Sequence, residues 1–239
     1  MDTFIGPDHP ALLGKTGRGV VVATIDSGIA NGHPHVGLVT GGVTIGADGL
    51  DEDGFADRLG HGTAVPAAIR EKAPDITLLA VRVFHDDLST SVASIVRGID
   101  WASQRGAHLI NLSLGTSNPD HAEVLTAAVD RARARGAFLV SARQHNGKEW
   151  LPGCLADVVS VVLDPACERA GVLVGHQDGR PVFRASGLPR PIPGVPAERN
   201  LQGISFAVAN VTGIVARLLE GVDRPSSPDA FVRDIFAPS

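Results

Sequence analysis

The fold follows from one stretch near the amino terminus, GVVVATIDSG, residues 19–28. Residues 19–25 are small, apolar or β-branched without a charged break, which is typical of a parallel strand buried on both faces. Asp26 lies where this strand ends. Open α/β sheets build their sites at the carboxyl ends of their strands. We therefore predict a parallel sheet with Asp26 at its functional edge.

The rest of the chain alternates between the two kinds of element. Further strands are predicted at 76–83, 107–112, 137–141 and 157–163, and helices at 61–71, 91–104, 120–135 and 205–219. Such alternation indicates an α/β domain with right-handed crossovers. We assign residues 1–221 to this domain, a size at which one core suffices. Residues 222–228 resemble a linker and 229–236 a short amphipathic helix, so 222–239 is not a separate domain.

Composition excludes several classes of partner. The net charge is −5, and no apolar run reaches the roughly 18 residues of a membrane span, so we expect neither nucleic acid nor membrane as a partner. The first residues lack the basic and apolar regions of a secretory signal, and the two cysteines suit reduced thiols, which predicts a cytoplasmic location. No cofactor or metal is expected, since the acidic run at 51–53 is typical of a solvated loop. The oligomeric state is not indicated.

Three short motifs carry the chemistry: TIDSG at 24–28, GHGT at 60–63 and GISFA at 203–207. If they converge, His61 can take the proton of Ser205 as its hydroxyl attacks a carbonyl, while Asp26 orients the imidazole. His61 and Ser205 each open a predicted helix, and the partial positive charge there favours a developing anion. The motifs therefore predict an Asp-His-Ser nucleophilic triad.

The order of these residues and their flanks resemble the subtilisin-like serine peptidases over about residues 14–220. The flanks that match are DSGI followed by HP at 33–34, DRLGHGT at 57–63 and INLSLG at 110–115. The resemblance implies a three-layer α/β fold whose central, mostly parallel sheet is flanked by helices. It also implies a serine endopeptidase that works through an acyl-enzyme. The compact subtilases that process precursors of ribosomally made peptide natural products are the most similar kind.

The same resemblance assigns the substrate-binding residues. The segment Ser113, Leu114 and Gly115 corresponds to the edge strand to which an extended peptide or precursor peptide adds by main-chain hydrogen bonds. Ala142, Arg143 and Gln144 stand where the family lines its first specificity pocket with small residues. Long side chains there predict a preference for a small or acidic residue before the scissile bond. Alternatively, Arg143 points to solvent.

The oxyanion hole departs from the family pattern. The family places an asparagine after the strand at 137–141, and its side chain donates to the oxyanion. An ungapped match puts His145 there, and a one-residue slip brings in Asn146. Losing such a donor costs about 3–4 kcal/mol, a figure measured on subtilisin itself. We expect either a histidine-based hole or a weakened enzyme. The alternatives are a pseudo-peptidase that binds a peptide or partner without cutting it and, ranked lower, a transpeptidase or macrocyclase.

Overall fold

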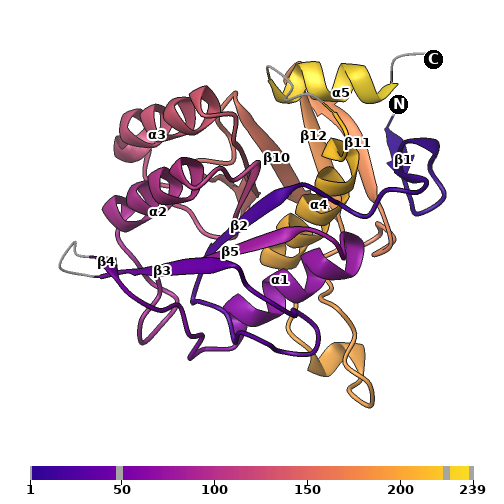
Figure 1. Ribbon diagram of the computed structural model, residues 1–239. Coiled ribbons are helices and arrows are strands. Elements are labelled where there is room, and N and C mark those ends of the chain that lie inside the picture. The colour runs from indigo at the N-terminus through magenta and orange to yellow at the C-terminus, as the bar shows by residue number, and fades with distance from the viewer. Residues whose placement is uncertain (1, 47–50, 223–226, 237–239) are drawn as a thin grey trace.

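A computed structural model describes residues 2–46, 51–222 and 227–236 of the chain (Figure 1). Within these residues a ten-stranded sheet forms the centre of the molecule. Its strands lie in the order β1 (Thr3–Ile5), β11 (Val172–Gln177), β12 (Arg180–Ala185), β10 (Val158–Leu163), β7 (Phe138–Ala142), β6 (Leu109–Leu112), β2 (Val21–Asp26), β5 (Thr77–Arg82), β3 (Gly41–Ile45) and β4 (Asp51–Glu52). Pairing is parallel from β12 to β3 and antiparallel at both edges. The predicted mostly parallel sheet is thus confirmed.

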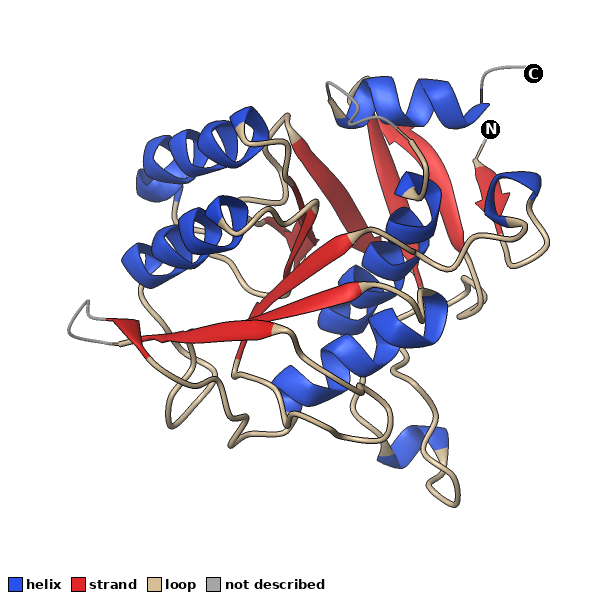
Figure 2. Cartoon of the chain, viewed as in Figure 1, coloured by secondary structure: helices blue, strands red, loops and turns tan. Residues whose placement is uncertain are grey.

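Helices cover both faces of the sheet, which gives three layers (Figure 2). On one face lie α1 (His61–Lys72) and α4 (Ile204–Leu219), which pack against each other. On the other face lie α2 (Val92–Gln104) and α3 (Ala122–Ala134). Short 3-10 turns occupy Pro10–Leu12, Pro119–His121 and Ala197–Arg199.

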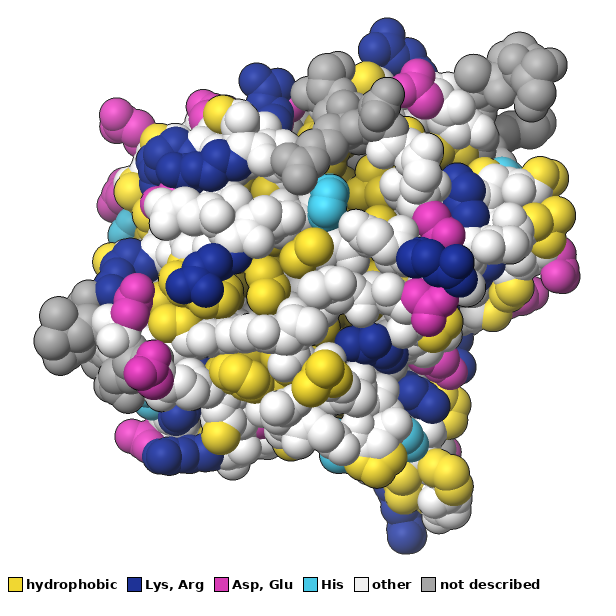
Figure 3. All heavy atoms as spheres, in the orientation of Figure 1, with side chains coloured by type: hydrophobic (Ala, Val, Ile, Leu, Met, Phe, Trp, Pro, Cys, Tyr) yellow, Lys and Arg dark blue, Asp and Glu magenta, His cyan; other side chains and the backbone are white. Residues whose placement is uncertain are grey.

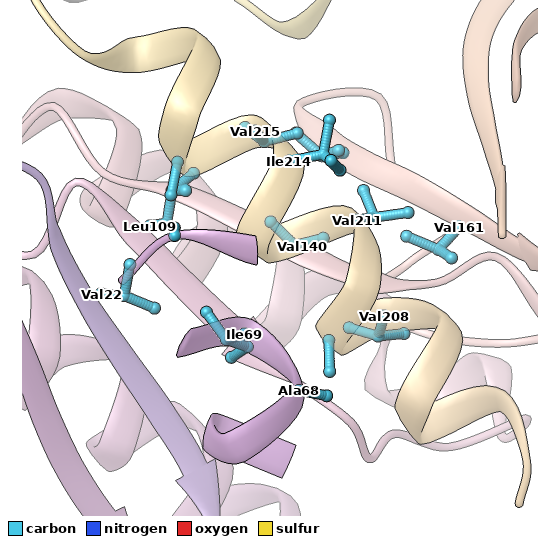
Figure 4. Close-up of a cluster of buried hydrophobic side chains, with 14 of the residues drawn as sticks. Val22, Ala68, Ile69, Leu109, Val140, Val161, Val208, Val211, Ile214 and Val215 are labelled. Carbon is cyan, nitrogen blue, oxygen red and sulfur yellow. The ribbon is translucent and has the colours of Figure 1, made fainter. Parts of the chain in front are cut away.

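Two hydrophobic clusters, one on each face, explain why the central strands are apolar throughout. On β2, Val22 packs with the cluster around α1 and α4, and Ala23 and Ile25 pack with the cluster around α2 and α3. Figure 4 shows the first cluster, where side chains of α4 such as Val211 and Ile214 meet residues of α1 and the strands. Because α4 is buried along most of its length, its first turn, which carries Ser205, is held firmly against the sheet.

A buried polar contact fixes α4 to the strand beside the site. The hydroxyl of Thr212 donates to Oδ1 of Asn111 at 2.9 Å, and both side chains are fully buried. The amide of Asn111 donates in turn to the hydroxyl of Ser113 at 2.9 Å. This chain of hydrogen bonds links the middle of α4 to the segment that follows β6.

Some elements differ from the sequence-based expectation. The crossover from β7 to β10 contains no helix, and carries instead a small hairpin of β8 (Gln144–His145) and β9 (Lys148–Glu149). The antiparallel strands β11 and β12 were not predicted. The predicted terminal helix is present as α5 (Pro228–Phe236), with Phe231 and Val232 buried, whereas residues 223–226 of the predicted linker lie outside the described residues.

Candidate active site

Asp26 and His61 meet at the carboxyl end of the sheet. The carboxylate of Asp26, only 1% exposed at the end of β2, accepts a hydrogen bond from Nδ1 of His61, with distances of 2.8 Å to Oδ1 and 3.0 Å to Oδ2. An ionised carboxylate only accepts, so Nδ1 carries the proton and Nε2 is free to act as a base. The backbone N–H of Ser27 also donates to Oδ1, at 2.7 Å. The imidazole is therefore fixed in the tautomer that the chemistry needs.

Asp57 holds the turn that leads into α1. Its Oδ1 accepts from the hydroxyl of Ser27 and the N–H groups of Leu59 and Gly60, each at 2.9 Å. Its Oδ2 accepts from the N–H and the hydroxyl of Thr63, at 2.8 and 2.6 Å. These bonds secure the residues on both sides of His61.

The pKa of His61 lies above its ordinary value. Burial favours the neutral ring, but the hydrogen bond and negative charge of Asp26 and the charge of Asp57 outweigh it. A histidine held by a carboxylate in this way is suited to act as a general base.

A glycine allows the close approach of α1 to the strand that carries Asp26. A Cβ added at Gly62 would lie 2.2 Å from the carbonyl oxygen of Gly28 and 2.8 Å from the hydroxyl of Ser27. The N–H of Gly62 donates to that hydroxyl at 2.9 Å. The small residue after the histidine is therefore a steric requirement of the site.

Ser205 lies in the first turn of α4 and shares a cavity with His61. This catalytic cavity has a volume of about 750 Å³. The hydroxyl of Ser205 lies 3.4 Å from the carbonyl oxygen of Ser113. The three predicted motifs are thus brought to one place, with Ser205 and His61 facing the same space and Asp26 buried behind His61.

The cavity has two walls formed by loops at the carboxyl ends of neighbouring strands. One wall is the predicted edge segment, where Ser113, Leu114 and Gly115 follow β6. The other wall, residues 88–92, follows β5 and was missed by the sequence analysis. The position of Asp26 was predicted from the rule that sites lie beyond the carboxyl ends of parallel strands. The same rule applied to β5 would have predicted this wall.

The hairpin of β8 and β9 separates the two candidate oxyanion donors. His145 lines the catalytic cavity together with Ser205, and its ring centroid lies 5.3 Å from that of Trp150. Asn146 occupies the turn of the hairpin with φ of 50°, is exposed, and is not among the residues that line the cavity. Of the two candidates, only His145 lines the catalytic cavity.

Trp150, which the sequence analysis did not single out, fills the space beside the edge segment. It lines the catalytic cavity, and a Cβ added at Gly115 would come within 2.6 Å of its indole nitrogen. Thr116 and Leu151 exchange two backbone hydrogen bonds of 3.0 and 2.8 Å, which join the end of the edge segment to the residue that follows Trp150. A large aromatic side chain thus stands against the edge segment.

The three predicted pocket residues lie elsewhere than expected. Ala142 is buried at the end of β7, and Gln144 is exposed on the hairpin. Arg143 points inward: its side chain is 3% exposed, and its guanidinium donates to Asp178 in the β11–β12 turn at 2.6 Å. None of the three is among the residues that line the catalytic cavity, and the buried Arg143 does not point to solvent as the alternative predicted.

The described residues contain no group of three or more histidine, cysteine, aspartate or glutamate side chains arranged to hold a metal ion. Cys154 and Cys167 are both free thiols. In the described part of the chain no helix is long and apolar enough to cross a membrane.

Comparison with known proteins identifies the class to which this fold and site belong. Solved structures of a cold-adapted subtilisin-like serine proteinase and of proteases from Pseudoalteromonas arctica superpose on the chain with TM-scores of 0.71 each, at 21% and 20% identity. They cover 91% and 94% of this chain and 81% and 84% of theirs. The fold is therefore subtilisin-like.

Sequence comparison places the chain within that class. Residues 17–149 match the subtilase family. M-protease of Shouchella clausii is 32% identical over 223 residues, which are 87% of this chain and 54% of that protein. Subtilisin BL and Subtilisin Savinase of Lederbergia lenta are 31% and 32% identical over 222 residues, 87% of this chain and 76% of each relative. The chain belongs to the subtilase family of serine proteases.

Proposed function

We propose that this chain is a serine endopeptidase that cleaves an extended peptide through an acyl-enzyme. The observation that carries the proposal is the hydrogen bond of 2.8 Å between Asp26 and His61, together with the cavity that His61 shares with Ser205. The two loop walls, 88–92 and 113–116, leave a groove between them, which suits a peptide strand paired by its main chain.

The mechanism follows from the positions of these groups. Nε2 of His61 removes the proton of the Ser205 hydroxyl as its oxygen attacks the substrate carbonyl, and Asp26 stabilises the imidazolium that forms. His61 then gives the proton to the leaving amine, which frees the downstream half of the peptide. Water enters, loses a proton to His61 and hydrolyses the ester on Ser205, which restores the hydroxyl.

The oxyanion is stabilised by the first turn of α4 and by His145. The backbone N–H of Ser205 lies at the amino end of α4, where the helix dipole favours negative charge. His145 lines the same cavity and supplies the side-chain donor that the family takes from asparagine. A ring N–H is an adequate donor for this purpose.

The residue before the scissile bond is small. Trp150 lies close against Gly115 of the edge segment and lines the catalytic cavity, which supports a preference for small side chains at this position. The substrate, whether a precursor peptide or another extended chain, is thus selected for a small residue at the cut.

The test is cleavage of a defined peptide mixture, with products read by mass spectrometry. We expect cuts after small residues, no cuts with Ser205→Ala, and new cuts after leucine or phenylalanine with Trp150→Ala. If the folded protein cuts nothing while it still binds peptides, the pseudo-peptidase alternative holds. If joined or cyclic products dominate over hydrolysis, the enzyme is a transpeptidase.

A cytoplasmic location is part of the proposal, and the two free thiols support it. Thiol labelling of the protein isolated from its own cells would check it, since both cysteines should react without prior reduction once the chain is unfolded.

A further inference from the structure

A second cavity of about 540 Å³ lies beside the amino terminus of α1. One face of that helix, residues 60–67, forms its floor, and residues 30–35 and 189–201 form its sides. The segment 189–201 is the orange loop with a short helical turn that projects at the lower right of Figure 1. The cavity shares none of its lining residues with the catalytic cavity.

The free charge that faces the second cavity is positive. Arg190 and Arg199 line it, and Asp57 is the one acidic residue among the described lining residues. His33 and His35 also line it, but burial and the nearby Arg190 lower the pKa of His35, so the positive charge is that of the two arginines. The carboxylate of Asp57 is already used by five internal donors within 3 Å. The arginines are not balanced in this way, although the whole chain carries a net charge of −5. An acidic ligand would therefore complement this surface.

The same cavity offers apolar surface between its charges. Ile192, Val195 and Leu201 line it and are 44%, 38% and 48% exposed. Figure 3 shows hydrophobic atoms beside arginine or lysine side chains on the projecting loop at the lower right. Large apolar side chains that gather in one exposed hollow are typical of a binding surface rather than of ordinary solvent-exposed surface.

Hydrogen bonds hold the projecting loop in place. The guanidinium of Arg190 donates to the carbonyl oxygen of His35 at 3.1 Å, and the amide of Asn200 donates to the carbonyl oxygen of Arg190 at 3.3 Å. At the base of the loop, Asn210 on α4 donates to the carbonyl oxygens of Ser186 and Leu188, at 3.0 and 3.1 Å. The two sides of the cavity are thus tied to each other and to the helix that carries Ser205.

The position of the second cavity relative to the triad indicates which part of a peptide substrate can reach it. Gly60 precedes His61 directly, and Leu201 lies four residues before Ser205. The catalytic cavity, in contrast, extends away from the triad along residues 88–92 and 113–116. A peptide paired with the edge segment and cut at Ser205 would leave the catalytic cavity on the side where Gly60 and Leu201 lie.

We propose that the second cavity binds the part of the substrate that follows the scissile bond, and that it selects segments that carry both acidic and apolar residues. This inference rests on the proposed peptidase function. Arg190 and Arg199 pair with the carboxylates, and Ile192, Val195 and Leu201 cover the apolar side chains.

Direct binding tests the surface without requiring catalysis. On Ser205→Ala protein, fluorescence anisotropy would be measured with three labelled peptides that alternate leucine with aspartate, asparagine or lysine. Because exposed charge pairs are individually weak, we expect the aspartate peptide to bind only about tenfold more tightly than the lysine peptide. The difference should shrink in high salt. Equal affinities, or no binding of the aspartate peptide at about millimolar concentration, would overturn the inference.

Variants assign the effect to the loop. Arg190→Gln combined with Arg199→Gln should remove the preference, and Arg199→Glu alone should reverse it without touching the bond from Arg190 to His35. The matched control is Arg105→Gln, an exposed arginine at the end of α2 that contacts Trp101. It should leave the preference unchanged, and an equal loss in this control would contradict the assignment.

Cleavage then separates this inference from the proposed function. Quenched peptides with identical upstream halves would carry the three downstream halves, and kcat/KM should be about tenfold higher for the aspartate form than for the lysine form. Equal cleavage of all three overturns the inference and leaves the peptidase intact. If the aspartate peptide binds but no peptide is cut by the wild type, the proposed function fails, and with it the assignment of the cavity to the downstream segment.

Discussion

Asp57 acts on the reaction through His61 and is in this sense a positioning residue. Its charge helps to raise the pKa of His61, and a base works only when unprotonated, so kcat/KM should rise as the pH passes upward through that raised pKa. Asp57→Asn removes the charge, and the acidic limb of the pH profile should move to lower pH while kcat falls. Asp8→Asn, an exposed acid on the amino-terminal segment, serves as control. An unshifted limb in Asp57→Asn would show that the contact is structural alone.

The same shift links His61 to stability. A histidine whose pKa is raised by folding stabilises the native state fully below its unfolded pKa, and this contribution disappears as the pH rises through the folded pKa. The pairing with Asp26 therefore favours the fold most under mildly acidic conditions, where the enzyme itself is least active.

His145 is expected to be the side-chain donor to the oxyanion. His145→Ala should lower kcat by about 10²- to 10³-fold, the range found when a donor of this kind is removed, with KM changed little. Asn146→Ala should have almost no effect, because Asn146 lies exposed in the hairpin turn. Steady-state kinetics of both variants on one peptide substrate would decide. The reverse pattern would mean that Asn146 reaches the site when substrate binds.

Among the secondary-structure elements, α4 is the one that connects the core to the catalytic serine. Thr212→Val keeps the shape of the side chain but leaves Oδ1 of the buried Asn111 without its donor from α4. An unsatisfied buried polar atom costs about 1–3 kcal/mol, so the free energy of unfolding should fall by that amount in urea titrations. Thr40→Val, at a partly buried hydroxyl that donates to the carbonyl of Leu78, is a matched control with a smaller expected loss. A loss no larger than that of the control would contradict this account.

The elements that the sequence predicted are those whose patterns are local. β2 is an unbroken apolar run that ends in Asp26, and α2 shows its helical spacing plainly, so both were found within about two residues of their bounds. β11 and β12 were missed because they form an antiparallel hairpin whose residues alternate weakly and pair with each other and with distant strands.

The residues of the candidate site likewise fall into those that local motifs predict and those whose position depends on contacts distant in the sequence. Asp26, His61 and Ser205 carry distinctive neighbours, and their convergence was predictable from the motifs. Trp150 was not, because its role depends on contact with Gly115, which lies far away in the sequence. The orientation of Arg143 depends equally on Asp178, a partner that no local pattern indicates.

At the scale of the whole chain, the terminal helix α5 packs on the body of the protein. Phe231 and Val232 are 3% and 4% exposed and pack with the cluster around α1 and α4. Phe231→Ala should therefore lower the free energy of unfolding by about 3–5 kcal/mol, the usual cost of truncating a buried phenylalanine. Val222→Ala, at an exposed position before the tail, should cost far less. An unfolding curve of Phe231→Ala that overlays the wild type would show that α5 does not dock in solution.

The central claim is that Asp26, His61 and Ser205 form a working nucleophile beside an unusual oxyanion hole. Intact-mass analysis after incubation with a fluorophosphonate probe tests it most directly, with Ser205→Ala as the control. We predict one adduct per chain, mapped to Ser205 and absent from the variant. Folded wild-type protein that stays unmodified would contradict the claim, and the chain would then be a peptide-binding member of its family.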